Sequence, residues 1–352
     1  MRLARLQGSP NYRNGRFVNA LPTLRSGLSA GTVREWLLGA KGNREPTSPV
    51  LVDPETAARL AGPAADLRVT WFGHSTLVVE VEGVRFLTDP VFGDYASPGP
   101  LFGVRRFFAP PVPLDGLPPI DAVVLSHDHY DHLDAGTIQQ LADRVPRFVV
   151  PLGVGAHLEA WGVAPDKITE LDWWEEREVK GVRLVATPAR HFSGRSLVGR
   201  DGTLWAGWAF IGARRRAYFS GDSAMTPQFA EVGDRLGPFE VAMVEVGAYD
   251  AAWSDVHMGP EQAVEAFQMA RGGLLVPVHW GTFNLAFHGW TEPIERLLVA
   301  AERAGVTVAV PRPGGSVEPD APPALERWWP QVPWRTAEEA PVVSTGLATA
   351  AA

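Results

Sequence analysis

The chain of 352 residues contains no cysteine, and this absence removes several kinds of chemistry. Disulfide bonds, thiolate nucleophiles and metal sites with cysteine ligands are all excluded. A metal ion would have to be held by histidine, aspartate or glutamate side chains. Lysine is also scarce, so arginine carries nearly all of the positive charge; the three lysines are Lys41, Lys167 and Lys180.

Long apolar runs and charge blocks of one sign are missing as well. No run approaches the roughly 20 apolar residues that a membrane-spanning helix needs, and the polar residues of segment 7–14 interrupt any secretory signal. Lys plus Arg is 32 and Asp plus Glu is 40, a net charge of −8, which argues against a nucleic-acid partner. We expect a cytoplasmic protein. Peripheral contact with the inner face of the membrane through the Phe-rich loop 91–113 and homodimer formation are left open.

The composition and the order of elements predict one large domain with two appendages. With 45% hydrophobic residues the chain can bury a sizeable core. Residues 1–65, which include a helix-compatible stretch at Thr32–Leu38, form a lead-in packed on the main domain of residues 66–318. Residues 319–352 form an extension whose end we expect to be mobile.

Within residues 66–318, β-rich runs alternate with helical stretches in two similar halves. Strands are predicted at 67–72, 76–83, 84–89, 121–126, 148–151, 182–187, 204–211, 216–220 and 240–246. Helices are predicted at 134–145, 154–161, 225–236, 260–271 and 291–305. Each half begins with strands and closes with helices, which favours two facing sheets with helices outside, an α/β fold of four layers in the order αββα.

A cluster of histidines follows the predicted strand 121–126. Its sequence is His127-Asp128-His129-Tyr130-Asp131-His132. The pattern H-x-H-x-D-H should arise by chance in on the order of one in a few thousand such chains. A polar loop that caps a helix at Asp134 is the plain alternative, but packing requires no such clustering of imidazoles. The motif indicates a metal centre on His127, His129, Asp131 and His132.

Three more residues follow β-rich runs, from which they could join this cluster: His191 after RLVATPAR, Asp222 after AYFSG and His279 after GLLVPV. Each alone is better explained as a hydrogen-bonded structural residue, but as a set they suit two metal ions that share Asp222, since a bridging carboxylate offsets the repulsion between two dications. The ligand types fit zinc, and iron or manganese equally. A hydroxide between the two metals would be the nucleophile of a hydrolase.

These motifs resemble those of the metallo-β-lactamase superfamily, and most closely its group of N-acyl-phosphatidylethanolamine-hydrolysing phospholipase D-like enzymes. The resemblance rests on the lead-in segment 11–17 and on WFGHST (71–76), LTDPVF (87–92), SHDHYDHLD (126–134), PARHFSGR (188–195), SGDS (220–223) and VPVHWGTF (276–283). It implies an αββα sandwich and two zinc ions, the first held by His127, His129 and His191, the second by Asp131, His132 and His279, with Asp222 bridging. It also implies that Tyr130 and His257 contact the substrate.

Several further residues have two interpretations each. His74 and Asp89 either orient a metal ligand or serve a structural role. His288 lies either at the rim of the site or in a plain loop, and Trp280 beside His279 is a candidate to line a pocket. Arginines could neutralise a phosphate, although solvated surface roles are the safer interpretation for each; they are Arg105, Arg106, Arg190 and Arg195.

The leading hypothesis is a binuclear zinc hydrolase of small-molecule or lipid phosphodiesters. In it Asp131 is a ligand that orients the hydroxide, and His257 assists the leaving oxygen. The first alternative is a lactonase acting on a sugar-phosphate or acyl lactone, because the same nucleophile can attack a carbonyl carbon. The second is a non-catalytic binding module in which the metals only staple the fold.

Overall fold

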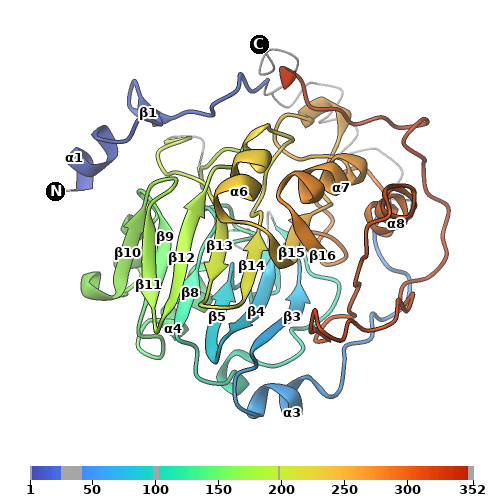
Figure 1. The fold of residues 1–352 in the computed structure, drawn as a ribbon, viewed down its shortest axis with the longest axis horizontal. Helices are drawn as coiled ribbons and strands as arrows, with labels where there is room; N and C mark the ends of the chain where they lie inside the picture. Colours follow the sequence, from blue (N-terminus) through green and yellow to red (C-terminus); the bar gives the residue numbers. More distant parts are fainter. Residues whose placement is uncertain (1, 25–41, 98–102, 197–198, 348–352) are drawn as a thin grey trace.

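The structure is a computed structural model, and it describes residues 2–24, 42–97, 103–196 and 199–347. The stretch Thr32–Leu38 and residues 348–352 at the end of the extension lie outside this description, so those two predictions remain predictions. Two sheets face each other at the centre, and helices lie outside them (Figure 1).

The first sheet has seven strands in the order β10-β9-β8-β5-β4-β3-β17. Its members are β3 (Leu67–Gly73), β4 (Thr76–Val81), β5 (Val84–Thr88), β8 (Ala122–Val124), β9 (Phe148–Pro151), β10 (Ile168–Leu171) and β17 (Ser316–Val317). The antiparallel meander β3-β4-β5 agrees with the tight turn at Glu82 and Gly83, both of which have positive φ. From β5 outward to β10 the strands are parallel.

The second sheet has six strands in the order β11-β12-β13-β14-β15-β16. They are β11 (Glu176–Val179), β12 (Val182–Thr187), β13 (Gly207–Ile211), β14 (Arg216–Phe219), β15 (Phe239–Glu245) and β16 (Gly272–Val278). Strands β14, β15 and β16 are parallel, so their carboxyl ends meet at one edge. Two small hairpins complete the set: β1 (Tyr12–Arg13) with β2 (Arg16–Phe17), and β6 (Tyr95–Ala96) with β7 (Val104–Arg105).

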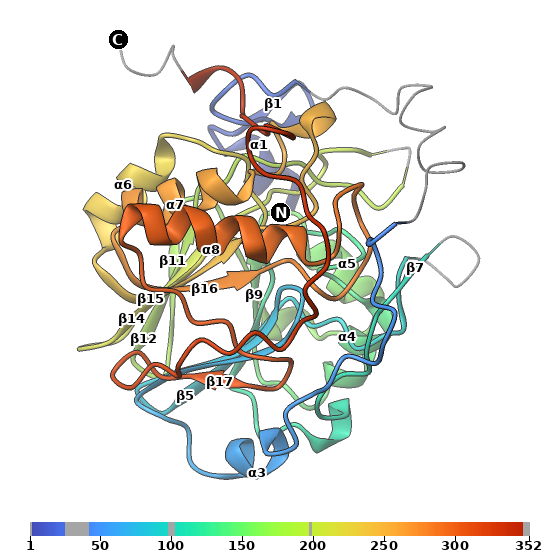
Figure 2. The same ribbon diagram turned by 90° about the vertical axis from the view of Figure 1, so that its right-hand side faces the viewer.

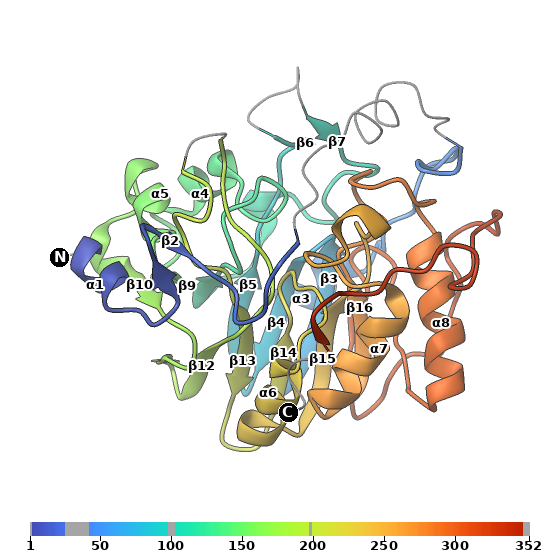
Figure 3. The same cartoon turned by 90° about the horizontal axis from the view of Figure 1, so that it is seen from above.

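Among the described helices, all but one lie on the outer faces of the two sheets. They are α1 (Arg2–Gln7), α3 (Thr56–Ala61), α4 (Ala135–Leu141), α5 (Gly155–Ala160), α6 (Gln228–Leu236), α7 (Pro260–Met269) and α8 (Glu292–Ala304), with short 3₁₀ turns η1 (Leu114–Gly116), η2 (Pro165–Lys167) and η3 (Ala251–Trp253). Figure 2 shows α6, α7 and α8 on one side of the strands and α3 on the opposite side. The exception is α1, which lies beside the edge strand β10 (Figure 3).

Alternation along the strands divides the apolar side chains between two layers of core. In β4, Leu77 and Val79 face the central cluster between the sheets, whereas Val78 joins an outer cluster. That outer cluster contains Ile138 and Leu141 of α4, so α4 covers the outer face of the first sheet. The predicted four-layer arrangement is confirmed.

Most predicted elements are present, with boundaries displaced by a few residues. The expected strand 204–211 begins at Gly207, and the expected helix 225–236 begins at Gln228. Strands β10 and β11 were not predicted, because ITEL and EREV lack the apolar alternation of a half-buried strand. Among the described residues, no helix combines the length and the apolar character needed to cross a bilayer.

Candidate metal centre

The carboxyl ends of several strands deliver the predicted residues to one place. The segment 127–132 follows β8, His191 follows β12, Asp222 follows β14 and His279 follows β16. Asp134 then caps α4 by accepting a hydrogen bond from the Gly136 N–H. All seven predicted ligands fall into overlapping groups of possible metal ligands, which also contain His74, Glu245 and His257. The contacts among the seven form two clusters, although more than 150 residues of sequence separate His127 from His279.

Three imidazoles make the first cluster. Nε2 of His127 lies 2.8 Å from Nδ1 of His129, and Nε2 of His191 lies 3.2 Å from that same atom. Asp222 is next to this group, with Oδ2 3.8 Å from Nε2 of His127 and 3.7 Å from Nε2 of His191. Three nitrogen atoms and one carboxylate oxygen therefore face a common point.

Hydrogen bonds behind the rings fix which nitrogen carries the proton. The backbone oxygen of Val256 can only accept, so Nδ1–H of His191 donates to it over 2.8 Å and Nε2 keeps its lone pair. The Ser126 hydroxyl donates to Asp89 over 2.6 Å and therefore accepts from Nδ1–H of His127 over 2.9 Å. Burial, reinforced by the neighbouring imidazoles, lowers the pKa of His127 well below its usual range.

The second cluster pairs two imidazoles with two carboxylates. Oδ2 of Asp222 lies 3.1 Å from Nε2 of His132 and 3.0 Å from Nε2 of His279. Oδ2 of Asp131 lies 3.4 Å from each of the same two nitrogens. Burial disfavours a charged ring at His279, but the Asp222 and Asp131 carboxylates together outweigh this effect and raise the pKa of His279 to about 10. This side of the centre attracts positive charge.

The donor set fits metal ions. Among the described residues, Nε2 of His132 and His279 and Oδ1 of Asp222 are buried without any hydrogen-bond partner. Buried polar atoms are seldom left unsatisfied, and lone pairs of neutral imidazoles held about 3 Å apart repel one another unless a cation lies between them. The two clusters would hold one cation each, with Asp222 reaching both.

His74 and Asp89 make the contacts expected of residues that orient ligands. Nε2 of His74 lies 2.9 Å from Oδ2 of Asp131. Asp89 accepts from Nδ1–H of His132 over 2.7 Å and from the Ser126 backbone N–H over 2.7 Å. His74, Asp89 and His279 all have positive φ, a conformation that non-glycine residues rarely adopt and that often marks functional sites.

The two predicted substrate contacts lie beside the clusters. Nδ1 of His257 lies 2.9 Å from Oε2 of Glu245 and 4.0 Å from Oδ2 of Asp222. The Tyr130 hydroxyl donates to the backbone oxygen of Arg195 over 2.7 Å. Glu245, the last residue of the buried strand β15, was not identified from the sequence. The only indication in the sequence is that a glutamate follows the apolar run VAMV.

The lead-in fixes the position of His191. Oδ1 of Asn19 accepts from the His191 backbone N–H over 3.1 Å, and the Asn19 amide donates to the His191 backbone oxygen over 2.8 Å. The Trp205 indole N–H also donates to Oδ1 of Asn19, over 3.0 Å. This side chain was not singled out from the sequence, because its partner is 172 positions away.

Arg190, the neighbour of His191, is neither a solvated surface residue nor a phosphate-binding one, so the interpretation made from the sequence was wrong for this arginine. It is 1% exposed and pairs with Asp255 over 3.1 Å. Its guanidinium also donates to the backbone oxygens of Pro22 and Thr345. Asp255 in turn accepts from the backbone N–H groups of Leu24 and Thr345. We call these five residues the terminal clasp.

Arg106 is also buried, and its guanidinium lies against the rings of Phe108 and Phe283.

Substitution Asp255→Ala is expected to lower the free energy of unfolding by about 3 to 5 kcal/mol, because it leaves the Arg190 guanidinium buried without its counter-charge. Denaturant unfolding of the metal-free protein measures the change. The matched control is Glu176→Ala, which breaks the exposed pair with Arg183 and should cost less than about 1 kcal/mol. Equal effects of the two substitutions would contradict the clasp.

Comparison with known proteins shows the family to which this chain belongs. A sequence model described as a beta-lactamase superfamily domain matches residues 84–280. An uncharacterized protein of Mycobacterium tuberculosis is 50% identical over 329 residues, covering 91% of this chain and 87% of its own length. The N-acyl-phosphatidylethanolamine-hydrolyzing phospholipase D 1 of Caenorhabditis elegans is 38% identical over 244 residues, covering 66% of this chain and 68% of its own.

A solved structure agrees in fold. The metallo hydrolase Igni18 of Ignicoccus hospitalis superposes with a TM-score of 0.54 at 23% identity, covering 71% of this chain and 97% of that one. The class defined by these matches is that of the metal-dependent hydrolases. The chain belongs to the metallo-β-lactamase superfamily and is related to the N-acyl-phosphatidylethanolamine-hydrolysing phospholipases D, which confirms the resemblance seen in its motifs.

Proposed function

We propose that the protein is a binuclear zinc phosphodiesterase acting on small-molecule or lipid phosphodiesters. The observation that carries the proposal is the paired donor set, two groups of buried His and Asp atoms that share Asp222. Bound divalent cations supply Lewis acidity and offset the charge that develops on phosphoryl oxygens. The relationship to phospholipases D supports a phosphodiester as the bond cleaved.

The chain's own residues have separate roles in this proposal. His127, His129 and His191 would hold one cation, Asp131, His132 and His279 would hold the other, and Asp222 would be shared between them. His74 fixes the orientation of the Asp131 carboxylate, so that Asp131 can orient the attacking nucleophile as well as bind metal.

Beside the metal ligands, His257 is the proton carrier and Tyr130 a substrate contact. Glu245 holds Nδ1 of His257, which leaves Nε2 of that ring to exchange a proton with the leaving oxygen. The Tyr130 O–H already donates a hydrogen bond to the backbone oxygen of Arg195, so toward substrate the hydroxyl oxygen acts as a hydrogen-bond acceptor.

Metal analysis combined with an activity panel tests the function. We expect about two zinc ions per chain and hydrolysis of bis(p-nitrophenyl) phosphate that is lost on chelation and restored by zinc. Iron or manganese in place of zinc would correct the metal but keep the mechanism. Turnover of lactones without turnover of phosphodiesters would replace the proposal with a lactonase. If the metal-loaded protein hydrolyses no activated ester, the remaining interpretation is a non-catalytic binding module in which the metals only stabilise the fold.

A lipid substrate has its own test. Phospholipid vesicles containing N-acyl-phosphatidylethanolamine would be offered beside water-soluble phosphodiesters, with co-sedimentation reporting peripheral binding. We expect measurable release of phosphatidate from these vesicles. Activity confined to soluble diesters would limit the substrate to small molecules. Light scattering of the protein without vesicles tests whether it forms a homodimer, which the sequence leaves open.

A further inference from the structure

The turn that carries His279 has a backbone conformation that a histidine does not favour. His279 has φ +63° and Gly281 has φ +66°, so the left-handed region is occupied on both sides of Trp280. Glycine tolerates this conformation, but a histidine in it is strained and keeps it only where the surrounding structure holds it. The strand pairing of β16 stops at Val278. Contacts outside the sheet must therefore hold His279 in its position.

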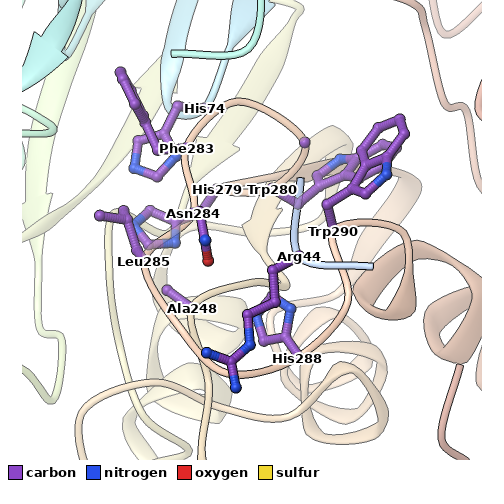
Figure 4. Close-up of a pocket in the computed structure, with 11 residues that line it drawn as sticks. Arg44, His74, Ala248, His279, Trp280, Phe283, Asn284, Leu285, His288 and Trp290 are labelled. Carbon is purple, nitrogen blue, oxygen red and sulfur yellow. The ribbon is translucent and has the colours of Figure 1, made fainter. Parts of the chain in front are cut away.

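Trp280 anchors this turn. Its indole N–H donates to the backbone oxygen of Pro277 over 3.3 Å, and its backbone oxygen accepts from the Thr282 hydroxyl over 3.2 Å. In Figure 4 the ring of Trp280 points away from the ring of His279, which lies toward His74. Trp280 lines a pocket beside His279, as predicted, but that pocket has room for about one water molecule. The indole therefore has a packing role there and not a substrate-binding one.

A second tryptophan connects this anchor to the other side of the site. The rings of Trp71 and Trp280 are stacked, with centroids 5.6 Å apart and an angle of 11° between their planes. The Trp71 indole N–H donates to the backbone oxygen of His74 over 2.9 Å, and the same oxygen accepts from the His279 backbone N–H over 2.9 Å. The stacked pair therefore supports the backbone of both histidines.

Two rings of the C-terminal extension, residues 319–352, complete this stack. The Trp328 ring lies 5.3 Å from that of Trp280 and 6.0 Å from that of Trp71. The Trp329 ring meets Trp280 edge-on at 5.5 Å, and its indole N–H donates to Oε1 of Glu295 in α8 over 2.7 Å. Aromatic pairs at these distances attract each other beyond the effect of the area that they bury. A segment distant in sequence thus packs on the residue next to a candidate metal ligand.

We propose that Trp328 and Trp329 are positioning residues for His279, which act through Trp280 and make the extension part of the support of the second cluster. The inference rests on the proposed binuclear site but not on its substrate. Among the described residues, the ring contacts of the first cluster include no tryptophan. Loss of these rings should therefore act mainly on the second cluster.

Substitution Trp328→Ala tests the proposal, because this ring is only half-buried and its removal leaves the central core in place. We expect the affinity for the second cation to fall by about 10- to 100-fold, and that for the first cation to change by less than about threefold. Trp328→Phe, which keeps a ring, should recover most of the loss. The matched control is Trp334→Ala, which removes another half-buried tryptophan of the extension and should leave both affinities unchanged.

Zinc titration in competition with a coloured chelator gives the two affinities, and His279→Ala identifies the step that belongs to the second cation. If Trp328→Ala does not fold, Trp328→Leu fills part of the space without a ring to stack and carries the same expectation. Equal weakening of both steps in a folded variant would overturn the proposal. Affinities equal to those of the unaltered protein would overturn it as well.

Amide hydrogen exchange in the metal-free protein separates this proposal from the proposed function. The His279 amide is bonded to His74, and the His191 amide to Oδ1 of Asn19. We expect Trp328→Ala to speed exchange of the His279 amide by at least about tenfold through local opening, and to leave the His191 amide unchanged. Trp334→Ala should change neither. If the unaltered protein binds fewer than two cations but this difference is present, the binuclear function fails while the positioning role stands. Unchanged exchange at His279 would overturn the positioning role alone.

Discussion

Asp222→Ala is expected to remove most of the bound metal and all measurable hydrolysis. Oδ2 of this buried carboxylate lies within 3.8 Å of Nε2 in four imidazoles, two in each cluster. In the proposed binuclear site, its loss would take a ligand from both cations at once and remove the negative charge that offsets their repulsion. We therefore expect a loss well beyond the roughly 10- to 100-fold typical when a residue behind the ligands is changed. Metal content by elemental analysis and initial rates on a phosphodiester measure the effect.

Two further substitutions make this result specific. Asp222→Asn preserves size but not charge, so it should fail nearly as completely as alanine. Asp234→Ala, on the exposed face of α6, removes an aspartate that lies outside both clusters and should retain metal and rate. Thermal melting in chelator shows whether each variant is folded. Full metal content and normal turnover in a folded Asp222→Ala protein would refute the shared-carboxylate site.

Asp89→Ala is expected to weaken metal binding by about 10- to 100-fold without touching any ligand. The Asp89 carboxylate is fully buried and holds both His132 and Ser126, and Ser126 in turn holds His127. Removing it frees one ring of each cluster to rotate. It also leaves buried donors unsatisfied, which should lower the free energy of unfolding by about 3 kcal/mol. Competition with a coloured zinc chelator measures the first effect and denaturant unfolding the second.

Asp89→Asn separates the hydrogen bonds from the backbone conformation at this position. Asparagine tolerates the positive φ of residue 89, and its amide oxygen can still accept from Ser126. Its NH2 group cannot accept from Nδ1–H of His132, so zinc affinity should remain reduced while much of the stability returns. Zinc binding as tight in either variant as in the unaltered protein would show that Asp89 does not orient His132.

The clustering of the candidate ligands was predictable because topology, and not long-range packing, brings them together. His127, His129, Asp131 and His132 are adjacent in sequence, and the others each end a β-rich run. In layered sheets such ends converge on one edge, so a correct reading of the strands was enough to group His191, Asp222 and His279 with the motif. The fold itself followed from the same runs and the helices that close each half.

The supporting residues were not predictable, because their partners depend on packing between segments distant in sequence. Glu245 and Asn19 carry no local pattern, and only the structure shows that they hold His257 and His191. Arg190 was misread as a solvated side chain because its counter-ion, Asp255, is 65 positions away. Strand β11 was missed because three of its four residues face solvent at the edge of a sheet and are charged.

The terminal clasp has a consequence for how the chain can be shortened. Arg190 donates to backbone oxygens of both Pro22 and Thr345, so these two positions, 323 residues apart, lie within reach of one guanidinium group. Trimming either segment would withdraw a partner from the residue next to His191. We therefore expect truncations at opposite ends of the chain to disturb the same part of the candidate metal centre.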